Sequence, residues 1–424
     1  MRFSGFDDEW KKSNLGNISS NEMYGMNSAA KDYDGFNKYI RITDISETSN
    51  KFIPNPLTSP DGDLEDKYKL KKGDIVFART GASTGKTYLY DDNDRNLYFA
   101  GFLIKFHIDN ADPKFIFYNT LKEEYLNWVS VMSVRSGQPG INSNEYKKLP
   151  IILPSLDEQN KISNFLTSID KKIDLLERKH QFYQEFKKYL MQQIFTQKLR
   201  FTDYIEEWKT IKLKDVGEIN TGNTPSTKVN EYYSPKKYLW VTPSDISSKY
   251  IFDTAKRLSD EGAKKGRFVK KNSVLVTCIA SIGKNCIILE DGYFNQQINS
   301  ITPSQSFDLD FIYYLIDYNS EKMKNYAGIT ATPILNKKSF ENMKFEFPSF
   351  DEQKQISNML SNIDNKIFAI EELINKTQKF KKGLLQQMFV VRINWRCNFK
   401  LAKSPSFNKH LLILKNKIIF IIIE

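Results

Sequence analysis

Two stretches of the chain, residues 154–195 and 348–389, repeat one another in register, and this repeat limits the folds available to the chain. The first begins Pro-Ser-Leu-Asp-Glu-Gln and the second Pro-Ser-Phe-Asp-Glu-Gln, and each ends in Gln-Gln-Ile/Met-Phe. A constant offset of 194 residues relates the two stretches without a gap. Self-similarity at a fixed offset is the signature of a duplicated structural unit. The sequence therefore predicts a tandem repeat.

Each repeated stretch has the pattern of one long helix. Its apolar residues are spaced alternately four and three apart, with one break at His180, and an average spacing of 3.5 residues is typical of a coiled-coil seam. About 39 residues at a rise of about 1.5 Å make a rod of roughly 58 Å. The expected seam residues are Ile162, Leu166, Ile169, Ile173 and Leu176 in the first copy, and Ile356, Leu360, Ile363, Ile367 and Ile370 in the second.

The start and the partner of each helix can also be predicted. Ser155 with Glu158, and Ser349 with Glu352, have the spacing of a capping box, in which two side chains bond the free N–H groups of the first turn. A rod of this kind cannot bury its apolar stripe alone, and its simplest partner is the other copy. An ordinary pair of packed bundle helices is the alternative. Neither stretch holds catalytic residues, so the helices are predicted to act as spacers.

The duplication extends beyond the helices. An Arg-Phe pair followed by Glu-Trp opens each repeat, at residues 2–10 and 200–208, with an offset of 198 residues. Two regions of about 140 residues, roughly 11–150 and 209–344, lie between these openings and the helices. They correspond in pattern and diverge in sequence. A common scaffold with two different surfaces is therefore expected.

Both divergent regions read as mixed α+β domains. The shared landmarks are β-rich runs (38–45 and 237–246), turns that lead into buried strands (70–77 and 269–276), further apolar runs (98–106 and 293–301), helices (113–126 and 309–326) and closing loops (136–140 and 328–333).

Composition supports folded domains in a reducing compartment. Of the 424 residues, 40% are apolar and 13% aromatic, which argues against disorder. The three cysteines are odd in number and scattered, which disfavours a disulfide framework or a zinc site. The first residues lack the apolar core of a secretion signal, so a cytoplasmic location is expected. The net charge of +11 is compatible with a nucleic-acid partner and does not demand one.

Two divergent regions alternating with two near-identical helical segments resemble the specificity (S) subunit of type I restriction-modification systems. The Pro-Ser-x-Asp-Glu-Gln and Gln-Gln-Ile/Met-Phe motifs carry the resemblance, together with the junction at 199–208 and an Ala-Ser-x-Gly-Lys turn at 82–86 and 280–284. Each motif is weak alone, but their repeated order is specific. The resemblance covers about residues 1–390.

The resemblance implies an α+β fold with an internal tandem repeat and pseudo-twofold symmetry. Two mixed α/β target-recognition domains would be separated by two long helices packed as an antiparallel coiled coil. The expected divisions are target-recognition domains at 1–150 and 199–344, a central helix at 151–198, a distal helix at 345–390 and a tail at 391–424 that departs from the family.

The resemblance also implies a function and partners. Each recognition domain would read one half of a bipartite sequence in double-stranded DNA, and the rods would set the spacing between half-sites. Two methyltransferase (M) subunits would dock on the rods, nuclease-translocase (R) subunits would join the assembly, and no membrane would be involved. The chain itself would not be a catalyst and would bind no cofactor. S-adenosylmethionine would belong to the M subunits, and ATP and magnesium to the R subunits.

Residues 81–87 resemble a phosphate-binding loop, but three residues separate the two glycines where such a loop needs four. A tight turn that faces a DNA phosphate through Lys86 or Lys284, or a purely structural turn, is favoured instead. The acidic residues of 61–67 sit four apart in a polar stretch and read as a solvated loop rather than a nuclease site. The three histidines are dispersed, so neither a catalytic nor a metal site is predicted.

Polar residues near the turns and closing loops are the candidates for DNA contact. Arg79 stands out because a guanidinium can donate two hydrogen bonds to guanine. For each Gln or Asn, an ordinary loop or strand-end hydrogen bond is the alternative. The candidates are Arg79, Thr80, Ser83, Lys86, Gln138 and Asn142 in the first region, and Ser281, Lys284, Gln296, Gln297, Asn299, Thr330 and Thr332 in the second.

The tail at 391–424 is basic, and its apolar run is interrupted by Lys415, Asn416 and Lys417, so it is too short and too charged to span a bilayer. We expect it to be poorly ordered, as frameshift or read-through sequence or as a strain-specific extension. Two rival functions stay open. A fused methyltransferase or nuclease would need a cofactor motif that the sequence lacks, and a coiled-coil scaffold would make protein contacts without binding DNA.

Overall fold

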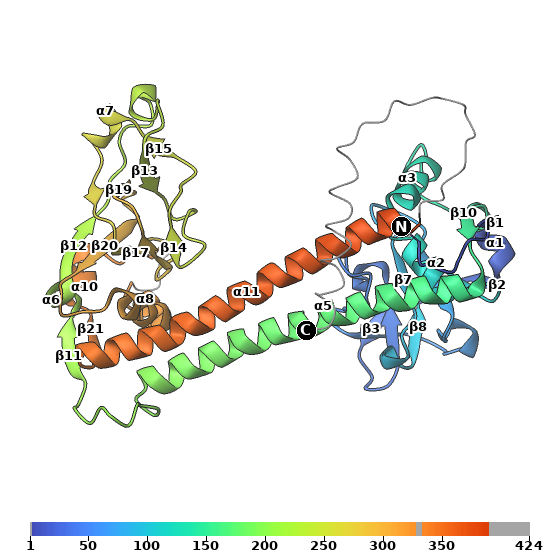
Figure 1. Ribbon diagram of the computed structural model, residues 1–424, viewed down its shortest axis with the longest axis horizontal. Coiled ribbons are helices and arrows are strands. Elements are labelled where there is room, and N and C mark those ends of the chain that lie inside the picture. The colour runs from blue at the N-terminus through green and yellow to red at the C-terminus, as the bar shows by residue number, and fades with distance from the viewer. Residues whose placement is uncertain (1, 328–332, 390–424) are drawn as a thin grey trace. The chain divides into compact units, whose positions relative to one another are not determined.

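The structure is a computed structural model that describes residues 2–327 and 333–389 (Figure 1). The chain divides into two compact units, Met1–Leu166 with Lys382–Glu424, and Thr167–Lys381, called unit 1 and unit 2. Both boundaries fall inside the long helices, so each unit holds one mixed domain together with parts of both helices. The expectations for the tail at 391–424 lie outside the described residues.

Unit 1 is built on a four-stranded antiparallel sheet of order β2-β9-β6-β7. Strands β4 and β8 pair in parallel beside it, and β3 pairs with β5. Strands β1 and β10 form a separate antiparallel ribbon. The strands are β1 (Lys11–Asn14), β2 (Ser19–Tyr24), β3 (Ala30–Asp32), β4 (Lys38–Ile40), β5 (Thr58–Pro60), β6 (Asp74–Ala78), β7 (Thr87–Leu89), β8 (Leu97–Phe99), β9 (Leu103–Ile108) and β10 (Pro150–Leu153). The helices are α1 (Leu15–Ile18), α2 (Pro113–Asn119), α3 (Glu123–Met132) and α4 (Ser143–Tyr146).

The central strand β6 is buried along its whole length, which explains its nearly continuous apolar sequence. Phe77 of this strand meets Phe106 of β9 edge-on at 5.5 Å between ring centroids, and meets Tyr146 of α4 at 5.0 Å. The core of unit 1 therefore joins the middle of the sheet to the last short helix before β10.

Unit 2 contains a five-stranded sheet of order β12-β20-β17-β18-β14 and a four-stranded sheet of order β15-β13-β19-β16. Strands β11 and β21 form an antiparallel ribbon. The strands are β11 (Lys209–Lys212), β12 (Gly217–Thr221), β13 (Tyr238–Val241), β14 (Tyr250–Ile251), β15 (Arg257–Leu258), β16 (Phe268–Val269), β17 (Ser273–Thr277), β18 (Asn285–Ile288), β19 (Gly292–Phe294), β20 (Ile298–Pro303) and β21 (Lys344–Phe347). The helices are α6 (Leu213–Val216), α7 (Asp260–Ala263), α8 (Leu309–Tyr318), α9 (Ser320–Tyr326) and α10 (Lys337–Asn342).

The two mixed domains share a core topology, to which unit 2 adds β14, β15 and β16. Strand β9 lies between β2 and β6 in unit 1, as β20 lies between β12 and β17 in unit 2. The parallel pair β4–β8 corresponds to β13–β19, and the ribbon β1–β10 to β11–β21. A mixed α+β scaffold that occurs twice is what the sequence repeat predicted.

Each helix predicted after the sheet is divided into two in the structure. The segment predicted over 113–126 becomes α2 and α3, and that over 309–326 becomes α8 and α9. At the first break the Thr120 hydroxyl donates to the Phe117 carbonyl at 2.7 Å, and at the second the Asn319 amide donates to the Leu315 carbonyl at 2.8 Å. Such local side-chain bonds compete with the helical pattern and end the helix.

The long helices are α5 (Leu156–Phe195) and α11 (Phe350–Met388). The backbone N–H of Glu158 donates to the Ser155 hydroxyl at 3.4 Å, and that of Glu352 to Ser349 at 3.4 Å, as half of a capping box requires. The predicted second half was wrong. The Glu158 carboxylate instead accepts two hydrogen bonds of 2.7 Å from Arg2, because a bidentate charged pair is stronger than a bond to a neutral backbone N–H.

The glutamine that ends the repeated motif also has a structural role. In unit 1 the Gln159 amide donates to the Pro154 carbonyl at 3.0 Å, and its oxygen accepts from the Asp112 backbone at 3.0 Å. Gln353 repeats both contacts in unit 2, with Pro348 and Asp308. Since Asp112 and Asp308 cap α2 and α8, each motif fixes the start of a long helix to the helix that precedes it.

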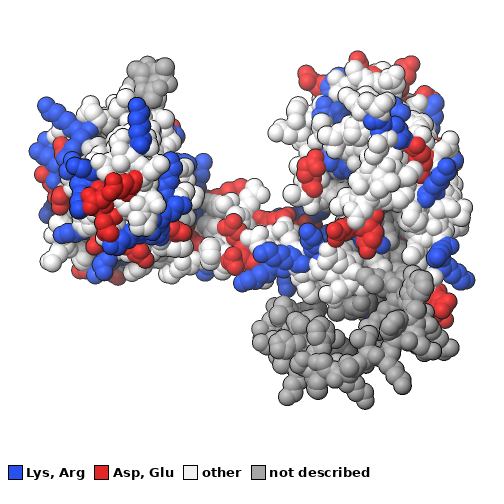
Figure 2. Space-filling view, turned by 90° about the horizontal axis from the view of Figure 1, so that it is seen from above, with Lys and Arg blue, Asp and Glu red and all other residues white. Residues whose placement is uncertain are grey.

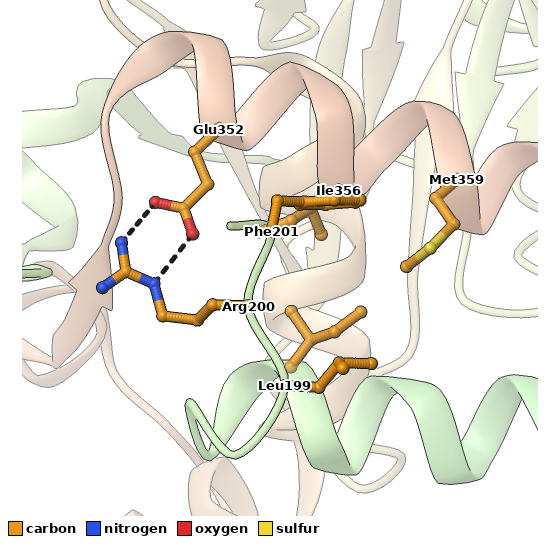
Figure 3. A pocket seen from close by; sticks show the side chains of 7 residues that line it. Leu199, Arg200, Phe201, Glu352, Ile356 and Met359 are labelled. Atoms are coloured by element: carbon orange, nitrogen blue, oxygen red, sulfur yellow. Dashed lines mark hydrogen bonds and ion pairs between the residues drawn. The ribbon is translucent and has the colours of Figure 1, made fainter. Parts of the chain in front are cut away.

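The equivalent junction in unit 2 is drawn in Figure 3. Arg200 donates to the two carboxylate oxygens of Glu352 at 3.0 and 2.8 Å, and the Trp208 indole donates to the same group at 3.3 Å. A cavity of about 90 Å³ lies beside this pair, lined by Ile194, Leu199, Arg200, Phe201, Glu352, Ile356 and Met359. Since small-molecule sites usually measure about 300–1,000 Å³, this cavity is too small for a nucleotide cofactor.

Within unit 2 the two long helices are linked by ion pairs. Lys187 of α5 lies 2.7 Å from Asp364 of α11, and Asp170 lies 2.6 Å from Lys381. As the residue number rises along α5, its partner's number falls along α11. Of the ten predicted seam residues eight are buried, while Leu176 and Ile367 are partly exposed. Among the described residues, no helix is at once long and apolar enough to cross a bilayer.

Candidate nucleic-acid interface

The Ala-Ser-x-Gly-Lys segments form the tight turns between β6 and β7 and between β17 and β18. Gly85 adopts φ +91° and Gly283 φ +86°, a region that favours glycine. A Cβ atom at Gly85 would lie 2.6 Å from the Val129 side chain of α3, and one at Gly283 would lie 2.7 Å from Ser320 of α9. The glycines are needed both for the turn and for the close approach of a helix.

The backbone of the first turn is satisfied internally. The N–H groups of Thr84, Gly85 and Lys86 donate to the carbonyls of Gly81, Ala78 and Ser83 at 2.9–3.1 Å. A phosphate-binding loop instead points successive N–H groups at its ligand. These three donors are therefore not directed at a phosphate, which agrees with rejecting a nucleotide site here.

The two lysines of the turns have different surroundings. The Lys86 side chain is only 9% exposed, pairs with Glu47 and donates to the Ile45 carbonyl at 3.1 Å. Lys284 is exposed, and within the described residues it makes no ion pair. A phosphate could approach Lys284 directly, whereas Lys86 would first have to leave Glu47.

Arg79 follows the end of β6, and its guanidinium contacts two aromatic rings. Its guanidinium carbon is 4.9 Å from the ring centre of Tyr24, at the end of β2, and 5.9 Å from that of Phe102, in the turn before β9. The Tyr24 hydroxyl accepts a 3.2 Å hydrogen bond from the backbone N–H of Ser143. Strand β2, strand β6 and the β8–β9 turn thus place one cation and two rings together.

The other candidates of unit 1 divide into surface and structural residues. Gln138 is exposed, and Thr80 and Ser83 are partly exposed. Thr80 also pairs with Gly140, which brings the loop holding Gln138 beside the β6 turn. Asn142 instead caps α4, where its side chain accepts from the Glu145 N–H at 3.0 Å. For Asn142, the structure shows an ordinary local hydrogen bond, which the sequence analysis gave as the alternative to DNA contact.

The candidates of unit 2 divide in the same way. Gln296 is exposed and Gln297 partly exposed, in the turn that leads into β20, and Ser281 is partly exposed in the β17 turn. Asn299 is only 2% exposed, accepts from Thr221 at 2.7 Å and bonds the Cys278 sulfur at 3.2 Å, so it lies inside the domain rather than at its surface. Thr330 and Thr332 lie outside the described residues.

Sequence reasoning missed Tyr24 and Phe102. Phe102 carried a weak signal, because a Gly-Phe pair between two apolar runs places a large apolar residue in a tight turn. Tyr24 carried none, since Arg79 is 55 residues away and only the pairing of β2 with β9 brings their neighbourhoods together.

Charge differs between the two domains. Residues 1–150 hold 20 Lys and Arg against 21 Asp and Glu, while residues 199–344 hold 21 against 17. On the face drawn in Figure 2, Lys and Arg side chains surround a smaller acidic group on the globular part of unit 2, at the left. A modest positive excess suits contact with a polyanion. In the described part of the chain, no three His, Cys, Asp or Glu side chains cluster as a metal site would require.

Comparison with known families gives one match, the type I restriction modification DNA specificity domain. It matches twice, at residues 7–181 and 205–379, and so covers most of the chain. Each match spans a mixed domain and most of the long helix that follows it.

Known specificity subunits align with about half to four-fifths of the chain. The type I restriction enzyme HindI specificity subunit of Haemophilus influenzae is 24% identical over 419 residues, covering 80% of this chain and 90% of that protein. The MjaIX specificity subunit of Methanocaldococcus jannaschii is 28% identical over 209 residues, covering 48% of this chain and 46% of that protein.

Among solved structures, the type I restriction-modification S subunit from M. genitalium superimposes with a TM-score of 0.58 at 15% identity, covering 92% of this chain and 98% of that one. A chain from a study of complex assembly and conformational transition of the type I R-M system gives a TM-score of 0.57 at 16% identity, with 91% and 99% covered. At this level of identity the likeness concerns the fold.

Proposed function

The chain belongs to the type I restriction modification DNA specificity family, and from that premise we propose that it is the non-catalytic subunit that selects the DNA sequence. Each of its mixed domains reads one half of a bipartite target in double-stranded DNA. The observation that carries this proposal is the pair of domains with one core topology and different side chains at the corresponding turns.

The candidate surface in each domain is the edge where the turn after the central strand meets the turn before β9 or β20. In unit 1 this edge presents Arg79, Thr80, Ser83 and Gln138, and in unit 2 it presents Ser281, Lys284, Gln296 and Gln297. Base edges in the major groove are read by side chains of these types. Two edges with different donors and acceptors suit an asymmetric target.

We propose that α5 and α11 pack as an antiparallel coiled coil with pseudo-twofold symmetry and act as the spacer between the two readers. The ion pairs Lys187–Asp364 and Lys381–Asp170 support an antiparallel register. A helix of 40 residues at about 1.5 Å per residue is about 60 Å long. Half-sites one helical turn apart are separated by about 34 Å, which a rod of this length can span.

The long helices would also be the docking surface for two M subunits, with R subunits joining the assembly. Several large apolar side chains on these helices are exposed, among them Leu175 at 65%, Phe182 at 60% and Phe368 at 65%. Exposed apolar groups of this size favour a protein partner. S-adenosylmethionine would then bind to the M subunits, and ATP and magnesium would bind to the R subunits.

The test is genome-wide adenine methylation in a host that carries this gene with its M partner. A bipartite methylated motif that disappears on deletion of the gene is the expected result. Replacing residues 209–344 by the corresponding region of a relative should then change one half-site and leave the other half-site and the spacing unchanged. A host that expresses the protein bound to M and shows no methylated motif would favour a protein-interaction scaffold instead.

A further inference from the structure

We propose that Arg79, held against the rings of Tyr24 and Phe102, is a specificity-determining residue of the first domain and reads a guanine in its half-site. This inference rests on the proposed function, since it takes for granted that the first domain reads DNA. It assigns to one side chain the discrimination of one base pair, and to the two rings the role of holding that side chain in position.

The first argument is that Arg79 is without a partner. In the described ranges, Arg41, Arg200 and Arg257 are partly buried and each pairs with a carboxylate at 2.8–3.0 Å. Arg79 is partly buried as well, yet within the described residues its guanidinium makes no hydrogen bond or ion pair, and its Nε is buried without an acceptor. A guanidinium whose donors have no acceptor in the protein is available to a ligand that supplies acceptors.

The second argument concerns which donors a ligand could reach. Nε is covered, whereas the two terminal nitrogens have no partner and are not among the buried unpaired atoms. A guanidinium presents its donors in a fixed plane, and its bidentate match among the bases is the O6 and N7 pair of guanine. The accessible end of Arg79 therefore has the chemistry for one particular base.

The third argument is preorganisation. Contact of the guanidinium with two rings restricts the rotamers of a side chain that is otherwise flexible, and it lowers the entropy lost when DNA binds. Tyr24 is itself fixed by the Ser143 N–H. Both rings remain accessible, Tyr24 at 40% and Phe102 at 59%, which places the cluster at the surface rather than in the core.

The fourth argument comes from the matching position in unit 2. The Arg79 N–H donates to the Phe102 carbonyl at 3.0 Å, and the Cys278 N–H to the Gln297 carbonyl at 2.8 Å, so Cys278 occupies the place of Arg79. Cys278 is 4% exposed, and burial raises the pKa of its thiol to about 12, so it is neutral. The second domain thus has no cation at this point, and the Arg79 cluster is not a requirement of the shared scaffold.

The experiment uses the full chain with its M partner. The wild-type methylated motif is determined first, and the half-site of the first domain is identified as the one that survives replacement of residues 209–344. The motif is then determined for Arg79→Ala and Arg79→Lys, since lysine keeps the charge and loses the bidentate geometry. Lys72→Ala, which removes an exposed charge from another turn of the same domain, is the matched control.

The expected result is that both Arg79 variants relax one G·C position of that half-site and leave the other half-site intact, while Lys72→Ala leaves the whole motif unchanged. In binding assays, 7-deazaguanine at that position removes the N7 acceptor. It should weaken the wild-type complex by about 2- to 12-fold, because it removes one of the two hydrogen bonds of a bidentate contact that contributes about 5- to 150-fold, and should barely affect the Arg79→Ala complex.

Three results would overturn the inference while the proposed function stands: a half-site without a G·C pair, an Arg79→Lys variant that folds and methylates the unchanged motif, or equal relaxation of both half-sites. Thermal unfolding of each variant separates loss of reading from loss of fold. A wild-type complex that methylates no bipartite motif would overturn the proposed function and this inference together.

Discussion

The two mixed domains have the same order of four central strands, β2-β9-β6-β7 and β12-β20-β17-β18, but different chemistry at matching positions. At the start of the central strand, Asp74 in unit 1 contacts His107 at 2.7 Å, whereas Ser273 in unit 2 bonds Thr302 at 2.8 Å. At the surface turn, an arginine in contact with two rings corresponds to a buried cysteine. The bonds that join each domain to its long helix are instead nearly identical. The two domains thus differ in surface side chains and in self-contained polar clusters. They agree in the arginine–glutamate bonds that join each domain to its long helix.

The largest expected effect comes from the buried acid of unit 1. Asp74 is fully buried and lies 3.9 Å from Lys105, whose side chain is 7% exposed. Asp74→Asn should lower the free energy of unfolding of unit 1 by about 3–5 kcal/mol, because it leaves a buried cation uncompensated. Ser273→Ala, its match in unit 2, should cost only about 1 kcal/mol. Denaturant unfolding compares them, and equal losses would contradict the difference between the two clusters.

The same variant should respond to pH. Burial lowers the pKa of Lys105, and Asp74 opposes this. Without Asp74 the folded-state pKa falls further below its unfolded value of about 10.4. The unfolded state then binds more protons between these two values, so the stability of Asp74→Asn should rise with pH in that window. The rise should be steeper than for the wild type.

The glutamates at the helix starts should behave alike. Glu158→Ala and Glu352→Ala each remove a carboxylate that accepts two hydrogen bonds from arginine. Each should cost about 2–3 kcal/mol, less than a fully buried pair because Arg2 and Arg200 are 33% and 21% exposed. Glu352→Ala should cost slightly more, since Trp208 also loses its acceptor. Hydrogen exchange in the first turns of α5 and α11 measures this, with Glu177→Ala as the control.

Replacing the glycine of each turn by alanine should destabilise the two domains to different degrees. Gly283→Ala brings a Cβ within 2.8 Å of the Ser320 backbone, whereas Gly85→Ala meets only the Val129 side chain. Because backbone yields less than side chain, Gly283→Ala should cost about 2–3 kcal/mol and Gly85→Ala about 1–2 kcal/mol. Gly137→Ala, which has open space and no positive φ, is the control in thermal unfolding. A reversed order would show that the α9 contact adapts more easily than the α3 contact.

The smallest effect concerns the turn lysines and rests on the proposed DNA contact. Lys284→Ala should weaken DNA binding by the M-bound chain a few-fold and reduce the slope of log affinity against log salt by about 0.9. Lys86→Ala should leave that slope unchanged, because Lys86 is already paired with Glu47. Titrations at several salt concentrations decide this, and equal slopes for both variants would show that the Lys86–Glu47 pair opens on DNA.

The repeated architecture could be predicted from the sequence because it depends on identity and period. The two long helices follow from a pattern within about forty residues, and the paired domains and the family follow from motifs that recur in the same order in both halves of the chain. The second half of the capping box could not be predicted, because the partner of Glu158 is Arg2, 156 residues away. The spacing of residues predicts local hydrogen bonds, and it does not predict which charged residue from a distant part of the chain will pair with Glu158.

The sequence predicted which turns would carry the candidate DNA contacts, but it did not predict how the side chains of those turns are arranged. Lys86 and Lys284 are equivalent in sequence, and they differ because Glu47 lies against one of them. Asn299 has the side chain of a base reader, yet the register of β20 turns it inward to Cys278. Tyr24 and Phe102 become candidate site residues only once strand pairing brings them into contact with Arg79.

Unit 1 also has a consequence for the order of events during synthesis. Phe389, near the end of the described chain, is buried and lies 5.0 Å from Phe115, and the Lys122 ammonium lies 5.0 Å from the Phe389 ring. Domains on a ribosome usually fold as they emerge, the first one first. Here the first domain emerges first, but its contact with Phe389 forms last. The residues of unit 2, Thr167–Lys381, are all synthesised before Phe389 and can fold earlier. A nascent chain would therefore present a finished second half and an open first half until the last turn of α11 is made.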